Sequence, residues 1–525
     1  MFGATISIRS LSRPLLAATV IFAARVSLAR RPLFASGLST FAKVTCGALL
    51  IAGTIGWINY LSMTCGGTDS YGYVSAGERL LAGAVVQDEP LAAILPANGI
   101  RAATSLGYVP SGRIPNASVP AYPLGLPAIM AIATLLFGRP GPFFVAPLCG
   151  VVLLAASYAI AYAWYRDRMT ALLAAALIAV NPLVFTYAIQ AMSDVPAAAA
   201  LMVAIAALSR TPPLPILAGI ASALTLITRP ALAPAALALA ALPLIAMGRQ
   251  GAAVVGRYLA PVTAGILVQG WTQWYLYGDI FGSGYGGIAD LFSIETSWFN
   301  ARSYLYWGYL TLGPIWLASV ALGIVTSKTL PRAVLGLVAI AVILPYLFYR
   351  PYDHWETLRF LLPVIVVATI IAATGMVETT RRVGNADAGA LAASVVALTL
   401  AWTWMSWLAA NQVFGLKEQE ARHRLAGELV TQATPEDAVV LALQHSGSLR
   451  YYTGRETVNW DQIPAGSFEA SVEALAGQGR PVFVVIDSAE ERVMFDARHG
   501  PVLETARWLP GGQRRNVQLF EAPRR

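Results

Sequence analysis

The apolar run VTCGALLIAGTIGWINYLSM, residues Val44–Met63, is followed two residues later by the polar and aromatic sequence GGTDSYGY, residues Gly66–Tyr73. An apolar run of about 20 residues is long enough to cross the ~30 Å hydrocarbon core of a bilayer as a helix. The sequence after it therefore begins at a membrane surface. There it places a carboxylate, Asp69, at the head of an expected helix and beside tyrosines, which is where a membrane enzyme would keep a base.

Composition indicates an integral membrane protein. Of the 525 residues, 57% are hydrophobic and only 12% are charged, and the mean hydropathy is +0.60. The net charge of +8 comes from basic residues in short clusters between apolar runs, which is typical of topology signals, so no nucleic-acid partner is expected. The three cysteines, Cys46, Cys65 and Cys149, are too few and too scattered for a disulfide or metal framework.

The pattern predicts a polytopic α-helical membrane protein with about eleven transmembrane helices, judged by length and hydropathy, together with juxtamembrane helices. The expected spans are 44–63, 142–164, 169–187, 193–209, 213–228, 230–247, 255–276, 304–325, 333–349, 359–375 and 388–410.

One further apolar run, Tyr122–Phe137, decides the topology. It contains Pro123 and Pro127 and follows a long polar loop. If it stays on the outer side, the basic clusters fall in cytoplasmic loops, as the positive-inside rule requires. If it crosses, every later cluster moves outside. We therefore interpret it as juxtamembrane. The basic clusters are Arg30, Arg31 and Lys43; Arg166 and Arg168; Arg210; Arg249 and Arg257; Lys328 and Arg332; and Arg381 and Arg382.

This topology divides the chain into three parts. Residues 1–43 form a cytoplasmic N-terminal segment, residues 44–410 the transmembrane domain with a first outer loop at 64–141, and residues 411–525 a small extracytoplasmic α/β soluble domain. The last part has the composition of a soluble protein but lacks a nucleotide-binding fingerprint, so we expect a cap or docking platform. The acidic residues of the outer loops place any chemistry on the outer face.

Five motifs stand out along the chain. They are TDSYGYVSAGERLLAG from Thr68, AYPLGLPAIMAIATLLFG from Ala121, TRPAL from Thr228, YGDIFGSGYGG from Tyr277 and RFLLP from Arg359. Their order is the one seen in GT-C integral-membrane glycosyltransferases. Over roughly residues 44–375 the chain resembles a bacterial relative of the dolichyl-phosphate-mannose protein mannosyltransferase and aminoarabinose lipid A transferase group.

The resemblance implies transfer of a sugar from a polyprenyl-phosphate-linked donor to a lipid, polysaccharide or protein acceptor on the extracytoplasmic face of a bacterial cytoplasmic membrane. The N-terminus is then cytoplasmic and membrane lipids surround the chain. Asp69 matches the acidic residue that the family carries in its first outer loop. Many relatives have two adjacent acids there, whereas this chain has Ser70 at the second position. No cofactor is therefore certain, and a divalent metal stays open.

The chemistry of the reaction suggests a role for each polar group. Asp69 is the candidate base, because a carboxylate in hydrogen-bond reach can take the proton of an acceptor hydroxyl. Asp194 is a candidate second acid. Arg229 and Arg359, each expected at an outer membrane boundary, are candidates for binding the lipid phosphate, because the guanidinium group offers planar bidentate donors. Candidate sugar, acceptor or carrier contacts are Tyr71, Tyr73, Tyr122, Tyr285 and His354.

Simpler roles stand beside these. Asp69 and Asp194 could cap their helices, the arginines could anchor helices among the headgroups, and the tyrosines could belong to an interfacial aromatic belt. His354 could be an ordinary surface histidine. Tyr285 lies in a glycine-rich loop that suits a mobile lid better than a phosphate cradle.

Two other function classes remain open. One is a polytopic transporter or flippase of a lipid-linked glycan, and the other is a non-catalytic membrane subunit. Transporters usually carry ionisable residues near the midplane of the membrane and show repeated halves. Here the span interiors are nearly free of charge and the charges gather on one face, which favours an interfacial enzyme.

Overall fold

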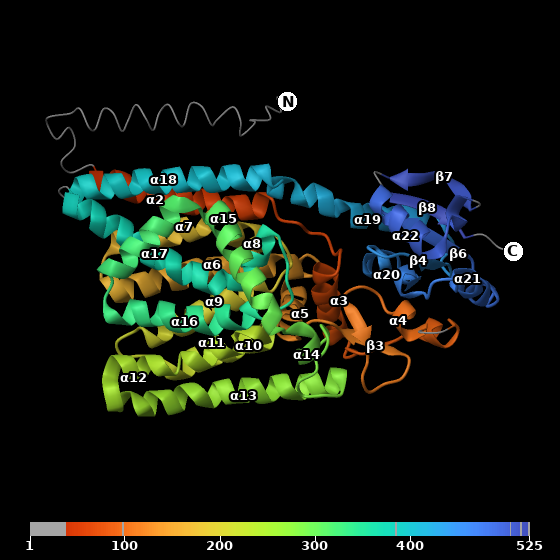
Figure 1. Ribbon diagram of the computed structural model, residues 1–525, viewed down its shortest axis with the longest axis horizontal. Helices are drawn as coiled ribbons and strands as arrows, with labels where there is room; N and C mark the ends of the chain where they lie inside the picture. Colours follow the sequence, from red (N-terminus) through yellow and green to blue (C-terminus); the bar gives the residue numbers. More distant parts are fainter. Residues whose placement is uncertain (1–37, 97–98, 384–385, 505, 515–516, 523–525) are drawn as a thin grey trace, which may run out of the picture.

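The computed structural model describes residues 38–96, 99–383, 386–504, 506–514 and 517–522. Most of the proposed N-terminal segment, residues 1–37, lies outside this range. The helices that make up the apolar body lie side by side in Figure 1. They are α2 (Leu38–Asn59), α6 (Gly141–Tyr165), α7 (Arg168–Ala179), α8 (Pro182–Ala188), α9 (Asp194–Leu208), α10 (Pro215–Thr228), η2 (Pro230–Leu232), α11 (Ala233–Ala238), α12 (Ala241–Met247), η3 (Gly248–Gly251), α13 (Ala252–Tyr277), α15 (Ser297–Thr326), α16 (Thr329–Leu347), α17 (Leu362–Val383) and α18 (Ala386–Ala410).

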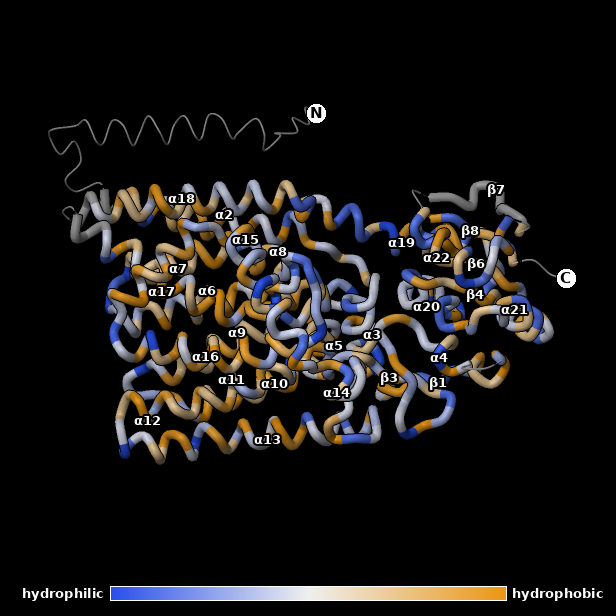
Figure 2. Tube along the Cα trace, in the orientation of Figure 1, coloured by the Kyte–Doolittle hydropathy of each residue, from blue (hydrophilic) through white to orange (hydrophobic). Residues whose placement is uncertain are grey.

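Among the described residues, seven helical segments are long and apolar enough to cross a membrane, and the bent pair α7 and α8 makes up to eight. Helices α9 and α10 are shorter apolar helices. The eleven expected spans fall on helical segments, but 169–187 is divided between α7 and α8, and 230–247 among η2, α11 and α12. The count of eleven crossings stays a prediction. The multi-pass membrane class is confirmed, and Figure 2 shows the hydrophobic residues concentrated along these helices.

The centre of the helical body is α17. In the span that contains α17, Trp355–Thr379, 89% of the most apolar stretch is buried inside the protein, whereas the value for α2 is 28%. Its Val, Ile and Ala side chains pack against α15, α18 and α7, so α17 is surrounded by protein while α2 faces outward. The η5 helix (Trp355–Leu361) leads directly into α17 and carries Arg359 at the end of this rigid element.

The predicted first outer loop is folded. It contains α3 (Asp69–Leu81), η1 (Pro90–Ala93), α4 (Gly99–Ala103) and α5 (Gly125–Phe137). Strands β1 (Gln87–Asp88), β2 (Tyr108–Pro110) and β3 (Ala117–Pro120) form an antiparallel sheet in the order β1-β3-β2. Helix α5 packs on both α3 and α6 and so joins this loop to the apolar body.

The C-terminal part combines helices with a five-stranded mixed sheet of order β5-β4-β6-β8-β7. Strand β4 pairs in parallel with β5 and β6, while β6 and β8 are antiparallel. This arrangement is of the α/β type, whereas the boundary at residue 411 stays a prediction. The elements are η6 (Val413–Gly415), α19 (Leu416–Ala433), β4 (Val439–Leu441), α20 (Ser446–Thr453), β5 (Glu456–Val458), η7 (Trp460–Gln462), α21 (Phe468–Ala476), β6 (Val482–Ile486), α22 (Ala489–His499), η8 (Val502–Glu504), β7 (Arg507–Arg514) and β8 (Val517–Glu521).

The C-terminal part lies beyond one end of the helical body, next to α3, α4 and β3 (Figure 1). Helix α19 continues from the end of α18 and bridges the two regions. Helix α20 packs against both α19 and α3. The segment that begins with Asp69 therefore lies between the apolar body and the C-terminal part.

Candidate functional site

The site is built around the first residue of α3. Helix α3 begins at Asp69, directly after a turn in which Gly67 has a φ of +61°. Glycine adopts this backbone conformation without steric cost. The Ser70 hydroxyl donates to the Thr64 carbonyl at 3.0 Å and ties the first turn of the helix to the preceding chain. Asp69 is thus held at a defined place, at the head of a helix as the sequence predicted.

Both carboxylate oxygens of Asp69 have partners from distant parts of the chain. The Tyr122 hydroxyl donates to Oδ1. The Arg359 guanidinium donates to Oδ2 from 3.2 Å. The side chains of Asp69 and Arg359 are 31% and 28% exposed, so this pair is open to a ligand.

A second acid–base pair, Asp194 with Arg229, lies deeper. Asp194 begins α9, and Arg229 occupies the break between α10 and η2. The two side chains form an ion pair and are 2% and 14% exposed. A charge that is buried to this degree requires a partner of opposite sign, and each of these residues supplies it to the other.

The two arginines are brought together by one aromatic ring. The guanidinium carbons of Arg229 and Arg359 both lie 5.4 Å from the centroid of Phe360. The ring of Tyr346 stacks on that of Phe360, with the centroids 4.7 Å apart and an interplanar angle of 3°. Both arginines that the sequence suggested for phosphate binding therefore belong to one cluster, to which η5 contributes Arg359 and the break between α10 and η2 contributes Arg229.

Three of the predicted tyrosines join the same cluster. The rings of Tyr73 and Tyr122 are 4.5 Å apart, and Tyr285 meets Tyr122 edge-on at 5.8 Å. The Tyr73 hydroxyl donates to Ser193 Oγ at 2.9 Å, next to Asp194. Burial, followed by the negative charge of Asp69, raises the pKa of Tyr122 above its usual value. Tyr122 is thus a neutral hydrogen-bond donor to Asp69 at ordinary pH.

Two predicted contacts lie elsewhere. Tyr71 is buried on the opposite side of α3, where its hydroxyl meets Ser105 Oγ at 3.3 Å and its ring packs against Gly447. His354 has an exposed side chain and lies 3.6 Å from Glu356. Within the part of the chain that the structure describes, no group of three or more His, Cys, Asp or Glu is placed to hold a metal ion.

Sequence reasoning did not single out Phe360, Tyr187, Tyr346 or Ser193. Phe360 follows Arg359 in the RFLLP motif, and Ser193 precedes Asp194. Their position next to candidate site residues could have indicated that they belong to the site. Tyr187 has its ring 5.7 Å from the Arg359 guanidinium, and Tyr346 comes from α16. These two stand in ordinary apolar spans, and only the packing of the helices shows that they belong to the site.

Comparison with solved structures identifies the architecture. ArnT from Cupriavidus metallidurans bound to undecaprenyl phosphate superposes with a TM-score of 0.58 and 11% identity, over 90% of this chain and 97% of ArnT. The chain has the GT-C fold. No family model matches the sequence, and no curated protein matches it either.

The Archaeoglobus fulgidus oligosaccharyltransferase, tethered to an acceptor peptide with an NVT sequon, shares the GT-C fold. It superposes with a TM-score of 0.54 and 13% identity, over 94% of this chain and 74% of the transferase. The archaeal oligosaccharyltransferase AglB from Archaeoglobus fulgidus, in complex with an inhibitory peptide and a dolichol-phosphate, superposes with a TM-score of 0.52 and a sequence identity of 13%. The fold expected from the order of the motifs is therefore confirmed.

Proposed function

We propose that this protein is a glycosyltransferase that moves a sugar from a polyprenyl-phosphate-linked donor to an acceptor on the extracytoplasmic face of a bacterial cytoplasmic membrane. The observation that carries the proposal is the cluster of Asp69 with Arg359 and Asp194 with Arg229 on a GT-C fold. The ligands of the structural neighbours, undecaprenyl phosphate and dolichol-phosphate, support a polyprenyl-phosphate carrier. A lipid, polysaccharide or protein would serve as acceptor.

The chemistry requires a base and a cation close together. The acceptor hydroxyl gives its proton to Asp69 while its oxygen bonds to the anomeric carbon of the sugar. The bond from that carbon to the phosphate oxygen breaks, and its electron pair stays on the phosphate. The leaving phosphate then gains negative charge, which a guanidinium group stabilises through paired N–H donors.

Arg359 is the better placed arginine for this charge. Its ion pair with Asp69 is partly open to solvent, whereas Arg229 is enclosed with Asp194. We propose that the donor phosphate accepts hydrogen bonds from the N–H groups of Arg359 that do not bond Asp69, and that Arg229 adds positive charge nearby. Arg359 then orients the Asp69 carboxylate, while the phosphate shares its charge and Asp69 stays able to accept a proton. Tyr122 holds the other oxygen of Asp69, and the rings of Tyr73 and Tyr285 offer faces to a sugar or an isoprenoid chain.

The test is the substitution Asp69→Asn, assayed in membranes with a labelled polyprenyl-phosphate sugar. The amide keeps the shape of the side chain but cannot accept the proton, so transfer should fall at least ~100-fold, the usual contribution of a general base. Asp88→Asn is the matched control, because Asp88 is an exposed carboxylate in the same outer loop. Unchanged transfer in Asp69→Asn would overturn the catalytic role and favour a non-catalytic subunit.

A further inference from the structure

The C-terminal part reaches the candidate base through α20. Four residues of this helix each contact the first outer loop. Arg450 bonds Glu89, Tyr451 bonds Glu78, Tyr452 bonds the backbone of Cys65, and Gly447, one turn earlier, packs against Tyr71. The last three partners belong to α3 or to the turn that precedes it.

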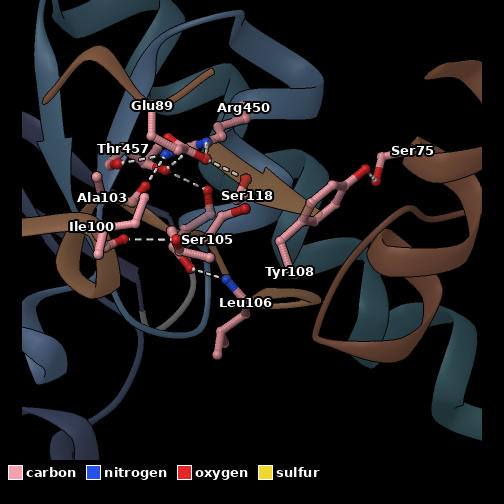
Figure 3. Close-up of polar contacts among 12 residues, drawn as sticks. Ser75, Glu89, Ile100, Ala103, Ser105, Leu106, Tyr108, Ser118, Arg450 and Thr457 are labelled. Atoms are coloured by element: carbon pink, nitrogen blue, oxygen red, sulfur yellow. Dashed lines mark hydrogen bonds and ion pairs between the residues drawn. The ribbon is translucent and has the colours of Figure 1, made fainter. Parts of the chain in front are cut away.

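Arg450 anchors α20 in place. It forms an ion pair with Glu89 at 2.8 Å, and the two side chains are 11% and 3% exposed. It also donates to the carbonyl oxygens of Ala103 and Thr457 (Figure 3). The Ser118 hydroxyl, also drawn in Figure 3, donates to the same oxygen of Glu89, and the distance between the two oxygens is 2.6 Å. Since these charges and donors are buried and satisfied, α20 is a fixed support and not a loosely placed surface helix.

The contact with the turn that precedes α3 is the hydrogen bond from the Cys65 backbone N–H to the Tyr452 hydroxyl, at 2.9 Å. Cys65 is 0% exposed, so this N–H has no access to water if the hydroxyl is removed. Next to it, a Cβ on Gly66 would lie 2.2 Å from the His423 ring, and only glycine permits so close an approach. The turn that leads into α3 is therefore clamped by α19 and α20.

The same turn determines where the carboxylate of Asp69 lies. The Gly66 carbonyl accepts from Tyr71 N at 3.3 Å, and the Thr68 carbonyl accepts from Gly72 N at 3.0 Å. A shift of Cys65 and Gly66 therefore moves the first turn of α3 as a unit. A displacement of about 1 Å at a reacting group is enough to reduce a rate substantially.

We propose that α20 is a positioning element for the proposed base, in which Tyr452 fixes the turn at Cys65–Gly66 that presents Asp69 to the acceptor. The inference rests on the proposed function where it concerns the catalytic role of Asp69. It assigns the C-terminal part of the chain a direct role at the site. Tyr452 is a positioning residue because it acts through the backbone that leads to Asp69.

The test compares Tyr452→Phe with Tyr451→Phe in the full-length protein. Both changes remove one hydroxyl from neighbouring positions of α20. Tyr451 bonds Glu78 at 3.0 Å, near the far end of α3, so its loss leaves the turn before Asp69 intact. Hydrogen–deuterium exchange of peptides within 64–72 should rise about tenfold in Tyr452→Phe only, because a buried amide loses its acceptor.

Kinetics supply the second measurement. In Tyr452→Phe, kcat should fall about tenfold while KM for the donor changes less than about twofold, because the base and not the donor site is displaced. Tyr451→Phe should keep both constants near those of the unchanged protein. Equal exchange in the two variants, or an unchanged rate in 64–72, would overturn the positioning role.

The two proposals fail in different ways. Hydrogen–deuterium exchange tests the positioning role of Tyr452 without any transfer assay, whereas sugar transfer by Asp69→Asn tests the proposed role of Asp69 as the base. Transfer that depends on Asp69 but not on Tyr452 would leave the proposed function standing and refute the inference. If Tyr452→Phe is not recovered as folded protein, Gly66→Ala tests the same turn from the other side, because its Cβ would meet the His423 ring. Gly66→Ala should raise exchange and lower kcat in the same way, and unchanged values would again refute the inference.

Discussion

At the scale of single residues, the partners of Asp69 come from other elements and not from its own helix. An aspartate at the head of a helix often accepts backbone N–H groups, and this was the simpler reading of the sequence. In the structure, one oxygen accepts from Tyr122 and the other from Arg359. A carboxylate held from two sides in this way has a fixed orientation, which is what a base requires.

Tyr122→Phe should lower kcat about tenfold, because Asp69 loses one of the two groups that orient it. The aromatic ring and its contacts with Tyr73 and Tyr285 remain, so the fold should be preserved. Tyr108→Phe is a matched control, since its hydroxyl meets Ser75, outside the cluster, at 3.0 Å. Initial rates with saturating donor measure the effect. A kcat equal to that of Tyr108→Phe would show that the Tyr122 hydroxyl does not orient the base.

The two arginines should differ in their effect on stability. Arg229→Gln leaves the Asp194 carboxylate, whose side chain is 2% exposed, without its counter-charge, and should destabilise the protein by about 3–5 kcal/mol. Arg359→Gln breaks a more exposed pair and should cost at most ~1 kcal/mol. Both variants should lose transfer. Thermal unfolding in detergent measures the difference, and equal melting temperatures for the two variants would contradict it.

At the scale of elements, α5 connects the outer loop to the helical body without the length of a full span. Its 13 residues extend about 20 Å, short of the ~30 Å hydrocarbon core. It is packed closely on both sides. A Cβ on Gly125 would lie 2.5 Å from the Ile227 backbone, and one on Gly77 would lie 3.0 Å from the Pro127 carbonyl. These contacts bring Tyr122 to Asp69, whatever the position of α5 in the membrane.

The juxtamembrane interpretation of α5 predicts where its far end is exposed. In a variant whose native cysteines are replaced, Arg139→Cys should react with a membrane-impermeant maleimide added outside intact cells, as Asp88→Cys should. Arg166→Cys should react only after permeabilisation, because the positive-inside rule places it in the cytoplasm. Protection of Arg139→Cys together with labelling of Arg166→Cys would mean that α5 crosses the membrane.

At the scale of the whole molecule, we expect the junction between the C-terminal part and the outer loop to be sensitive to pH through His423. Burial, together with the charges of His445 and Arg422 and against the opposing effect of Asp487, lowers the pKa of His423 from its ordinary 6.5 to about 3. The ring lies 3.9 Å from Glu420 on its own helix. As pH falls below about 6.5, the unfolded chain binds a proton that the folded protein excludes.

The free energy of unfolding should therefore decrease as pH is lowered from 7 to 5, with a contribution from this residue of up to ~1.4 kcal/mol per pH unit. Melting temperatures at several pH values measure it. His423→Gln removes the titrating group and should give a flatter dependence over the same range. An identical slope in the two proteins would show that His423 does not titrate on unfolding.

Several parts of the site were predictable because the local sequence carried them. Asp69, Asp194, Arg229 and Arg359 are charged residues at the ends of apolar runs, where a charge is costly unless it is used or paired. The pairing itself was not predictable, since Asp69 and Arg359 are 290 positions apart. The same limit applied to Tyr71, which differs from Tyr73 only in the face of α3 that it occupies.

The amino-acid sequence by itself determined the membrane class and most of the helical spans, and it singled out the charged residues that we propose as base and cations, because hydropathy and charge are local properties of the chain. The tertiary structure alone decided which acid meets which arginine, that both guanidinium groups lie near the Phe360 ring, and that α20 contacts the turn before Asp69. These contacts depend on how distant helices pack, and packing is fixed by the complementary shapes of many side chains at once.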